Sequence, residues 1–227
     1  GGGDLNGNAV NIWNSGVLDF AGDTDTLGTL TIYSGGITNT AASGVLTVGS
    51  LNMGNGPTGS KSYVGTSTGT LKLNGNVAFN VLNDPDIALI SGKLDLNGSR
   101  TFTVNNSVAP GAAVDMEVKA VISGASGQSI TKGGAGVLKL SGANTFDGNI
   151  SASDGSGTVI ASHPAALGTP SSPRTLSFGN NDTLALDGSN GNIVVPANYT
   201  NLTLNGAGDY QIGPVRGAII GQSGSNT

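Results

Sequence analysis

The sequence predicts an all-β protein, a right-handed parallel β-helix (a solenoid) with about 23 residues in each coil. Three observations support this fold class. A Gly-x-Leu-x-Leu-x-Gly phrase recurs along the 227 residues, the apolar residues stand in short alternating clusters, and there are 39 glycines. Only 10% of the residues are charged, against about 25% in an average globular protein. With 37% apolar residues, the chain is too hydrophobic to be disordered.

The recurring phrase sets the length of the repeat. Its copies begin at Gly16, Gly44, Gly69, Gly92, Gly136, Asp182 and Thr200. Counted from Gly69, the steps to the next three copies are 23, 44 and 46 residues, which correspond to one, two and two units. We expect residues 114–118 and Val159-Ile160 to fill the missing places. About nine or ten coils at a strand spacing of about 4.8 Å would form a rod about 45 Å long.

Each copy of the phrase has the period of a strand with one buried face. Leu71 and Leu73 point to one side of such a strand, and Lys72 points to the other. Because one short strand cannot bury its own apolar face, neighbouring coils must cover it. The spacing predicts three pairs between neighbouring coils: Leu71 with Leu94, Leu73 with Leu96, and Lys72 with Asp95.

Other short apolar clusters are expected to form the further sides of the coils. They are residues 30–32, 51–53, 79–81, 102–104, 176–178 and 193–195. Gly and Asn between them suit sharp corners, where positive φ angles are common, and stacked Asn side chains are expected to form ladders. A β-sandwich is the structural alternative. It does not explain the regular rhythm of the phrase, and the chain has one Trp and no Cys, so the usual immunoglobulin markers are missing.

Charge and hydropathy narrow the choice of partners. The net charge is −5 and the Lys and Arg residues are scattered, so no nucleic-acid partner is expected. No apolar run approaches the roughly 20 residues that span a bilayer, so we expect no membrane insertion. The chain starts with "GGGDLNGNAV", neither an initiating Met nor a signal peptide. We therefore expect one solenoid over residues 1–227, part of a longer protein whose preceding and following coils are its first partners.

One segment resembles a known repeat family. Residues 130–169 contain Thr131-Lys132, Gly134-Ala135-Gly136, Leu138-Lys139-Leu140, Ser141-Gly142-Ala143-Asn144-Thr145-Phe146 and Ala165-Ala166-Leu167-Gly168. This pattern resembles the autotransporter-associated β-strand repeat, also called the passenger-associated transport repeat. The likeness is looser over residues 130–227, and residues 1–129 share only the general style of generic coils. Phe146-Asp147-Gly148 departs from the Tyr-Thr-Gly usual in that family.

The resemblance implies an exported bacterial protein, located at the cell surface or secreted. Such repeats form β-helical passengers that act as a stalk or an adhesive surface, and no catalytic residue belongs to the repeat. We therefore expect no enzyme activity, no catalytic residues, no cofactor and no metal site. Surface glycans or neighbouring cells are candidate partners. Self-association through coil ends or sides is another, because uncovered strand edges favour it.

The competing hypotheses rest on carboxylates and one histidine. A polysaccharide-active enzyme would need two carboxyl groups about 5–10 Å apart, and the candidate pairs are Asp23 with Asp25, Asp84 with Asp86, and Asp95 with Asp115. The alternative interpretation is turn chemistry, in which Asp side chains bind local backbone N–H groups. His163, the only His, is expected to be a loop residue before Pro164. A self-assembling extracellular filament or surface-layer module is a further alternative.

Calcium is a further candidate ligand. The start of the chain, "GGGDLNGN", resembles a fragment of the calcium-binding nonapeptide repeat, and Asp groups supply the oxygen ligands that Ca²⁺ prefers. No tandem copies follow it, so the sequence predicts no bound metal.

Overall fold

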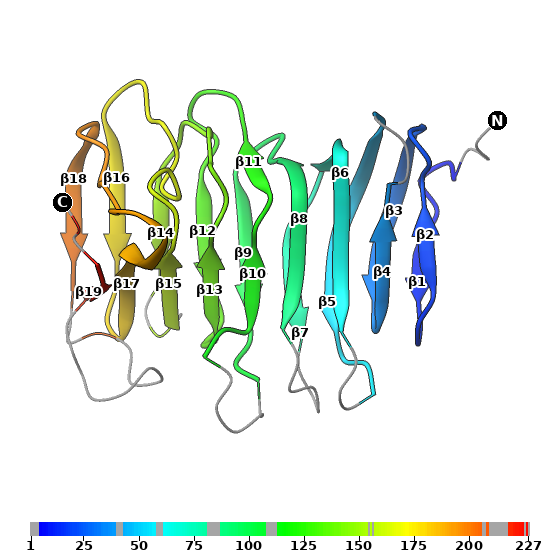
Figure 1. Ribbon diagram of the computed structural model, residues 1–227, viewed down its shortest axis with the longest axis horizontal. Helices are drawn as coiled ribbons and strands as arrows, with labels where there is room; N and C mark the ends of the chain where they lie inside the picture. The colour runs from blue at the N-terminus through cyan, green and yellow to red at the C-terminus, as the bar shows by residue number, and fades with distance from the viewer. Residues whose placement is uncertain are drawn as a thin grey trace.

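The fold is a parallel β-solenoid with about 25 residues in each turn. The computed structural model describes residues 5–39, 43–57, 61–80, 87–107, 113–153, 155, 157–205, 208, 218–224 and 226. Among these residues every strand pairing is parallel. Figure 1 shows the strands standing side by side along the long axis of the molecule, from the N-terminal end to the C-terminal end. This arrangement excludes the β-sandwich, because strands of a sandwich pair antiparallel.

The first ladder forms one side of the solenoid along its length. It joins β1 (Val10–Ile12), β3 (Thr24–Ile32), β5 (Val45–Gly54), β7 (Val77–Asn80), β9 (Arg100–Val104), β12 (Ile130–Gly133), β14 (Ile150–Ala152), β16 (Arg174–Phe178) and β18 (Tyr199–Leu204). The steps between register partners are unequal. The step from Phe102 to Lys132 is half as long again as the step from Val10 to Leu30. The loops absorb this variation, and the mean turn is slightly longer than the sequence predicts.

The second ladder forms another side. It joins β2 (Val17–Asp19), β4 (Gly35–Thr38), β6 (Ser62–Leu73), β8 (Ala88–Asp95), β10 (Met116–Val118), β13 (Val137–Leu140), β15 (Gly157–Ala161), β17 (Asp182–Asp187) and β19 (Ile219–Ser223). These strands alternate with those of the first ladder along the chain.

A third ladder exists only in the first part of the described chain. It uses the N-terminal halves of β3 and β5, the C-terminal halves of β6 and β8, and finally β11 (Val121–Ser123). After β11, the described residues on this side form loops and one short 3₁₀ turn at Gly188–Asn190. The regular three-sided coil therefore ends close to residue 130, where the family resemblance begins.

The predicted register between two coils is confirmed. Leu71 pairs with Leu94, and Lys72 pairs with Asp95. The next inward positions, Leu73 and Leu96, are fully buried. The Asp95 carboxylate accepts a hydrogen bond from its own turn, from the Asn97 backbone N–H at 3.0 Å.

The assignment of all copies of the phrase to one stack is wrong. The copies that begin at Gly44, Gly69 and Gly92 do stack, in the third ladder. The copies at Gly136 and Asp182 belong to the second ladder. The phrase encodes a strand with an inward face followed by a corner, and any side of a coil needs both. Local sequence therefore does not determine which side a copy occupies.

Two segments were expected to fill the missing units of the repeat, and only one of them lies where it was predicted. Val159 lies between Leu138 and Leu184 in the second ladder, as predicted. Residues 114–118 also fall in that ladder, because Met116 pairs with Leu138, and so they do not continue the stack of the Gly92 copy.

Most of the clusters expected on further sides of the coils are strands. Residues 30–32, 51–53, 79–80, 102–104 and 176–178 all lie in the first ladder, and residue 81 lies outside the described residues. The predicted strand at residues 193–195 is wrong, since this segment is a loop.

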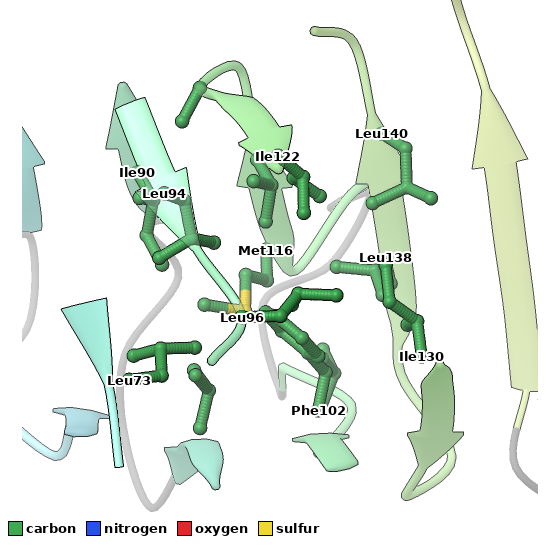
Figure 2. Packing of buried hydrophobic residues seen from close by; sticks show 14 of the residues in the cluster. Leu73, Ile90, Leu94, Leu96, Phe102, Met116, Ile122, Ile130, Leu138 and Leu140 are labelled. Carbon is green, nitrogen blue, oxygen red and sulfur yellow. The ribbon is translucent and has the colours of Figure 1, made fainter. Parts of the chain in front are cut away.

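The core is one continuous column inside the coils. The inward side chains of successive strands contact one another from Ile12 to Tyr199. Figure 2 shows Leu94, Met116 and Leu138 reaching from neighbouring strands into the same interior as Leu96, which directly follows β8. A thin core of this kind is stable because each coil covers the apolar faces of its neighbours.

The corners of the coils contain the expected Asn ladders. The Asn97 side-chain amide donates to the Asn74 side-chain carbonyl at 2.7 Å, and Asn105 donates to Asn80 at 3.3 Å. Glycine is required where coils approach closely. A Cβ atom added to Gly75 would lie 1.8 Å from the Gly49 carbonyl oxygen of the preceding coil.

Candidate functional site

The only histidine of the chain has a local role. His163 lies in the loop after β15, and its Nδ1 atom accepts a hydrogen bond from the Ala165 backbone N–H at 3.0 Å. This contact agrees with the expected loop position before Pro164.

Of the candidate carboxylates that the structure describes, Asp23 and Asp25 lie in the first coils, and Asp95 and Asp115 lie on different sides of the solenoid. Asp25 accepts a local hydrogen bond from the Thr26 N–H at 2.7 Å, which is turn chemistry. It also accepts one from the Leu5 N–H at 3.0 Å, 20 residues away along the chain. Its candidate partner Asp23 is exposed and directly precedes the same strand, β3. The pair of Asp84 and Asp86 lies outside the described residues.

The hypothesis that Asp95 and Asp115 stack is wrong. Asp95 pairs with Ser123 in the third ladder, whereas Asp115 directly precedes β10, a strand of the second ladder. The two carboxylates therefore belong to different sides of the solenoid.

Asp115 is a buried structural carboxylate. It is 1% exposed and accepts hydrogen bonds from the backbone N–H groups of Ser107, at 2.6 Å, and of Val137, at 2.7 Å. These donors lie on either side of it along the chain, in a loop and in β13. The carboxylate therefore ties together two segments that meet only in the folded solenoid.

Two polar residues that belong to the family-like motif itself are fully buried. Lys132 lies between Phe102 and Ala152 in the first ladder, and its ammonium group donates to the carbonyl oxygens of Gly133 and Gly134. Asn144 is also fully buried and lies in the loop after β13, on the third side of the solenoid, where no described strand continues the ladder beyond β11. The sequence motif contained both residues but gave no reason for them. Both supply hydrogen-bond partners to backbone groups in the interior.

Asn144 connects three coils. Its side-chain carbonyl accepts from the Ile122 N–H at 2.9 Å, and its amide group donates to the Ala166 carbonyl oxygen at 2.7 Å. Ile122 belongs to the coil before it and Ala166 to the coil after it. The amide thus continues the hydrogen bonding that β-strands provide in the first part of the chain.

Asn144 forms a first bridge between coils, and a second bridge, at Asp147, gave no signal in the sequence. The Asp147 carboxylate lies 2.9 Å from Nη2 of Arg174 and accepts a hydrogen bond from the Ser171 hydroxyl. The Ser171 bond first, and the Arg174 charge in addition, lower the pKa of Asp147. Nearby, the Tyr199 hydroxyl donates to the carbonyls of Gly148 and Leu167. Burial of this phenol raises its pKa well above the ordinary value.

A third bridge lies on the second ladder. Asp187 is 3.7 Å from the Lys139 ammonium and accepts from the hydroxyls of Ser162, at 2.9 Å, and of Ser223. Partial burial works against ionisation of Asp187. The hydrogen bonds from Ser223, Ser189 and Ser162 outweigh it and hold the pKa far below its usual range. The contacts of Asn144, Asp147 and Asp187 all join one coil to another, so we assign them a structural role.

Two hollows open on the surface of the described residues. One of about 630 Å³ crosses the ends of three strands of the first ladder, with Ser153, Gly179 and Asn205 among its walls. The other, of about 520 Å³, lies at an N-terminal corner and includes Lys61 and Tyr63. Within the described ranges no group of three or more His, Asp or Glu side chains is placed to hold a metal ion. No described helix is long and apolar enough to cross a membrane.

The N-terminal corner collects the described aromatic side chains that are not in the core. In the sequence the aromatic residues look spread along the chain. In the structure the rings of Trp13 and Tyr33 stack with their centroids 3.6 Å apart and their planes 11° from parallel. Tyr63 stands in the next coil, beside the smaller hollow. The signal that could have revealed this group is the spacing from Trp13 to Tyr33, which equals the register step from Val10 to Leu30.

Comparisons with known proteins identify no relative. No protein-family model matches the sequence, and no curated protein or solved structure is significantly similar to it. The fold is therefore established from the structure alone, as a parallel β-solenoid.

Proposed function

We propose that this chain is a structural or adhesive passenger segment of a bacterial surface protein similar to autotransporters. It acts as a stalk or an interaction surface and carries out no catalysis. The single observation that carries the proposal is the fit between the family-like motif and the solenoid. Lys132 and Asn144 are both motif residues, and both make hydrogen bonds to backbone groups inside the coils.

The physical character of the chain supports a stalk. In a solenoid each coil contacts mainly its neighbours, so length can grow without a larger core. We propose that the helix is right-handed and has nine to ten coils. The run of parallel pairs from β1 to β18 supports this number, and the general right-handedness of parallel crossovers supports the hand.

Exposed side chains on β18, the last described strand of the first ladder, support the proposal that a further coil packs on it. Leu202 and Leu204 are 49% and 44% exposed, although their register partners Leu176 and Phe178 are buried. A following coil, or the end of a second copy, would cover these side chains. We propose adjoining coils of the same protein as the first partner, with self-association as the alternative.

The location can be tested on intact cells. Cells that express the native protein are treated with an external protease, and the released and retained fragments are identified by mass spectrometry. Release of a large fragment that contains residues 130–227 supports a surface passenger. Complete protection of these residues in intact cells, with cleavage after lysis, contradicts it.

A further inference from the structure

The described aromatic residues divide into two groups. All five Phe residues and Tyr199 are at most 8% exposed and belong to the core. The others are Trp13, Tyr33 and Tyr63, and all three lie at one corner of the first coils. Such a concentration does not follow from core packing, since outward rings contribute little to the column inside the coils. It points to a surface that contacts something outside the chain.

The corner presents flat aromatic surface to solvent. Trp13 is 54% exposed although it stacks on Tyr33. In the neighbouring ladder the Tyr63 ring lies against the backbone of Gly36. A Cβ atom at Gly36 would come within 2.6 Å of Cδ2 of Tyr63. Gly36 therefore leaves room for the ring, and both aromatic surfaces are fixed by their neighbours.

A hollow of about 520 Å³ is lined by Tyr63 and by the residues that follow Trp13 and Tyr33 in the chain. Asn14 and Ser34, which directly follow Trp13 and Tyr33, both line it. Ser15, Lys61 and Tyr63 line it as well. The hollow therefore combines one aromatic ring, that of Tyr63, with hydroxyl, amide and ammonium groups, the mixture typical of a small-ligand site.

Ser34 gives the second, independent observation. Its side chain is 2% exposed, and its Oγ atom has no hydrogen-bond partner among the described residues. Buried hydroxyl groups are nearly always paired, so an unpaired one beside a hollow calls for an explanation. A ligand hydroxyl placed in the hollow would supply the missing partner.

We propose that this corner binds a carbohydrate, with one sugar ring against the aromatic surface of Trp13 and hydroxyl groups directed to Ser34, Asn14 and Ser15. A pyranose has an apolar C–H face that packs on an aromatic ring and a rim of hydroxyls that both donate and accept. A proline-rich peptide would also pack on the rings, but it offers few donors to the polar wall. Lys61, which is exposed at the rim, favours sugars that carry a carboxylate.

This inference goes beyond the proposed stalk and does not depend on it, because a stalk needs no ligand site. Its test uses the purified 227-residue chain and no cells, so its failure and a failure of the surface-passenger proposal can be told apart.

The chain contains one Trp, and its fluorescence therefore reports on this corner alone. The purified chain is first screened on a glycan array. The best binders, with cellotetraose, chitotetraose and tetragalacturonate as fixed members of the panel, are then titrated while Trp13 emission is followed. We expect a saturable change in the emission with at least one sugar. Absence of both array binding and any saturable change overturns the proposal.

Variants locate the binding, with affinities measured by calorimetry. Trp13→Ala should weaken binding by about tenfold or more, because exposed Trp residues are common anchors of binding sites. Trp13→Phe should restore part of it. Ser34→Ala should weaken binding by about three- to tenfold without lowering the melting temperature, since its hydroxyl has no partner to lose among the described residues.

The matched control is Val194→Ala, which removes an apolar side chain that is 48% exposed in a different loop. It should leave the affinity unchanged. Sugar binding that survives both Trp13→Ala and Ser34→Ala would place the site elsewhere and overturn the proposal. A fall in melting temperature with Ser34→Ala would show that the hydroxyl is structural and would also count against it.

Discussion

The side-chain amide of Asn97 donates a hydrogen bond of 2.7 Å to the side-chain carbonyl of Asn74, one coil earlier. Asn97 also has a φ angle of 45°, in the left-handed region. It therefore has two separable roles, one in joining coils and one in turning the chain.

Substitutions can separate these two roles. Asn74→Ala and Asn97→Gly each remove the hydrogen bond between the two side chains and should lower the free energy of unfolding by about 0.5–1 kcal/mol. Asn97→Ala should cost about 1 kcal/mol more than Asn97→Gly, because an alanine is strained at positive φ. Urea titration of the three variants measures this. Equal losses for Asn97→Gly and Asn97→Ala would contradict the assigned turn.

A larger loss of stability is expected at Asn144. Asn144→Ala leaves the Ile122 N–H and the Ala166 carbonyl without this partner in the interior, and it should cost about 2–4 kcal/mol of stability. The control is Asn149→Ala, which removes an exposed hydrogen bond to the Thr175 N–H. Water replaces that bond, so the control should lose about 1 kcal/mol or less. Similar losses for the two variants would show that Asn144 does not bridge coils inside the solenoid.

The close approach of coils can be tested at two glycines. Gly75→Ala places a Cβ atom 1.8 Å from the Gly49 carbonyl oxygen, whereas at Gly133 the nearest atom would be 3.5 Å away. Gly75→Ala should therefore destabilise the chain by about 1–3 kcal/mol, and Gly133→Ala should be nearly neutral. Thermal unfolding followed by circular dichroism compares them. A neutral Gly75→Ala variant would mean that the coils lie further apart there.

Asp187 should make the stability of the chain depend on pH in acid. The pKa of Asp187 is lowered in the folded state, and its unfolded value is about 3.9. The folded state thus binds this proton less readily than the unfolded state. Its stabilising contribution is present above about pH 4 and is lost as the pH falls below that value.

Asp187→Asn removes this dependence. Unfolding free energies measured from about pH 6 to about pH 2 should therefore fall less steeply below about pH 4 in the variant than in the parent chain. The absolute stability of the variant at the upper end of this range should be lower, because an amide makes weaker bonds to Lys139 and the serines. Parallel curves for the two proteins would contradict the role given to Asp187.

Some of the fold followed from the sequence for a clear physical reason. The pairs of Leu71 with Leu94 and Lys72 with Asp95 were predictable because strand period and coil length together fix a register. The sides of the coil were not predictable. The phrases at Gly44 and Gly136 are nearly alike, yet they lie in different ladders, because every side needs the same inward face and the same corner.

The bridges and the aromatic corner depend on contacts between coils. Asp147 meets Arg174, and Trp13 meets Tyr33, only because the loop lengths bring them to the same place in successive coils. Turn lengths vary too much along the chain for the mean period to find such pairs. The spacing of a single step could have found them.

Successive coils stack in one register along the first ladder, and distances between spin labels test this stacking most directly. The chain has no Cys, so pairs of cysteines introduced for the labels are unique. Single register steps lead from Asn11 through Thr31, Asn52 and Ala78 to Thr103, and then to Gly133.

Double electron–electron resonance measures these distances. It should give backbone separations of about 19 Å for labels at Asn11 and Thr103 and about 24 Å for labels at Asn11 and Gly133. Equal distances for the two pairs, or a shorter distance to Gly133 than to Thr103, would contradict the solenoid.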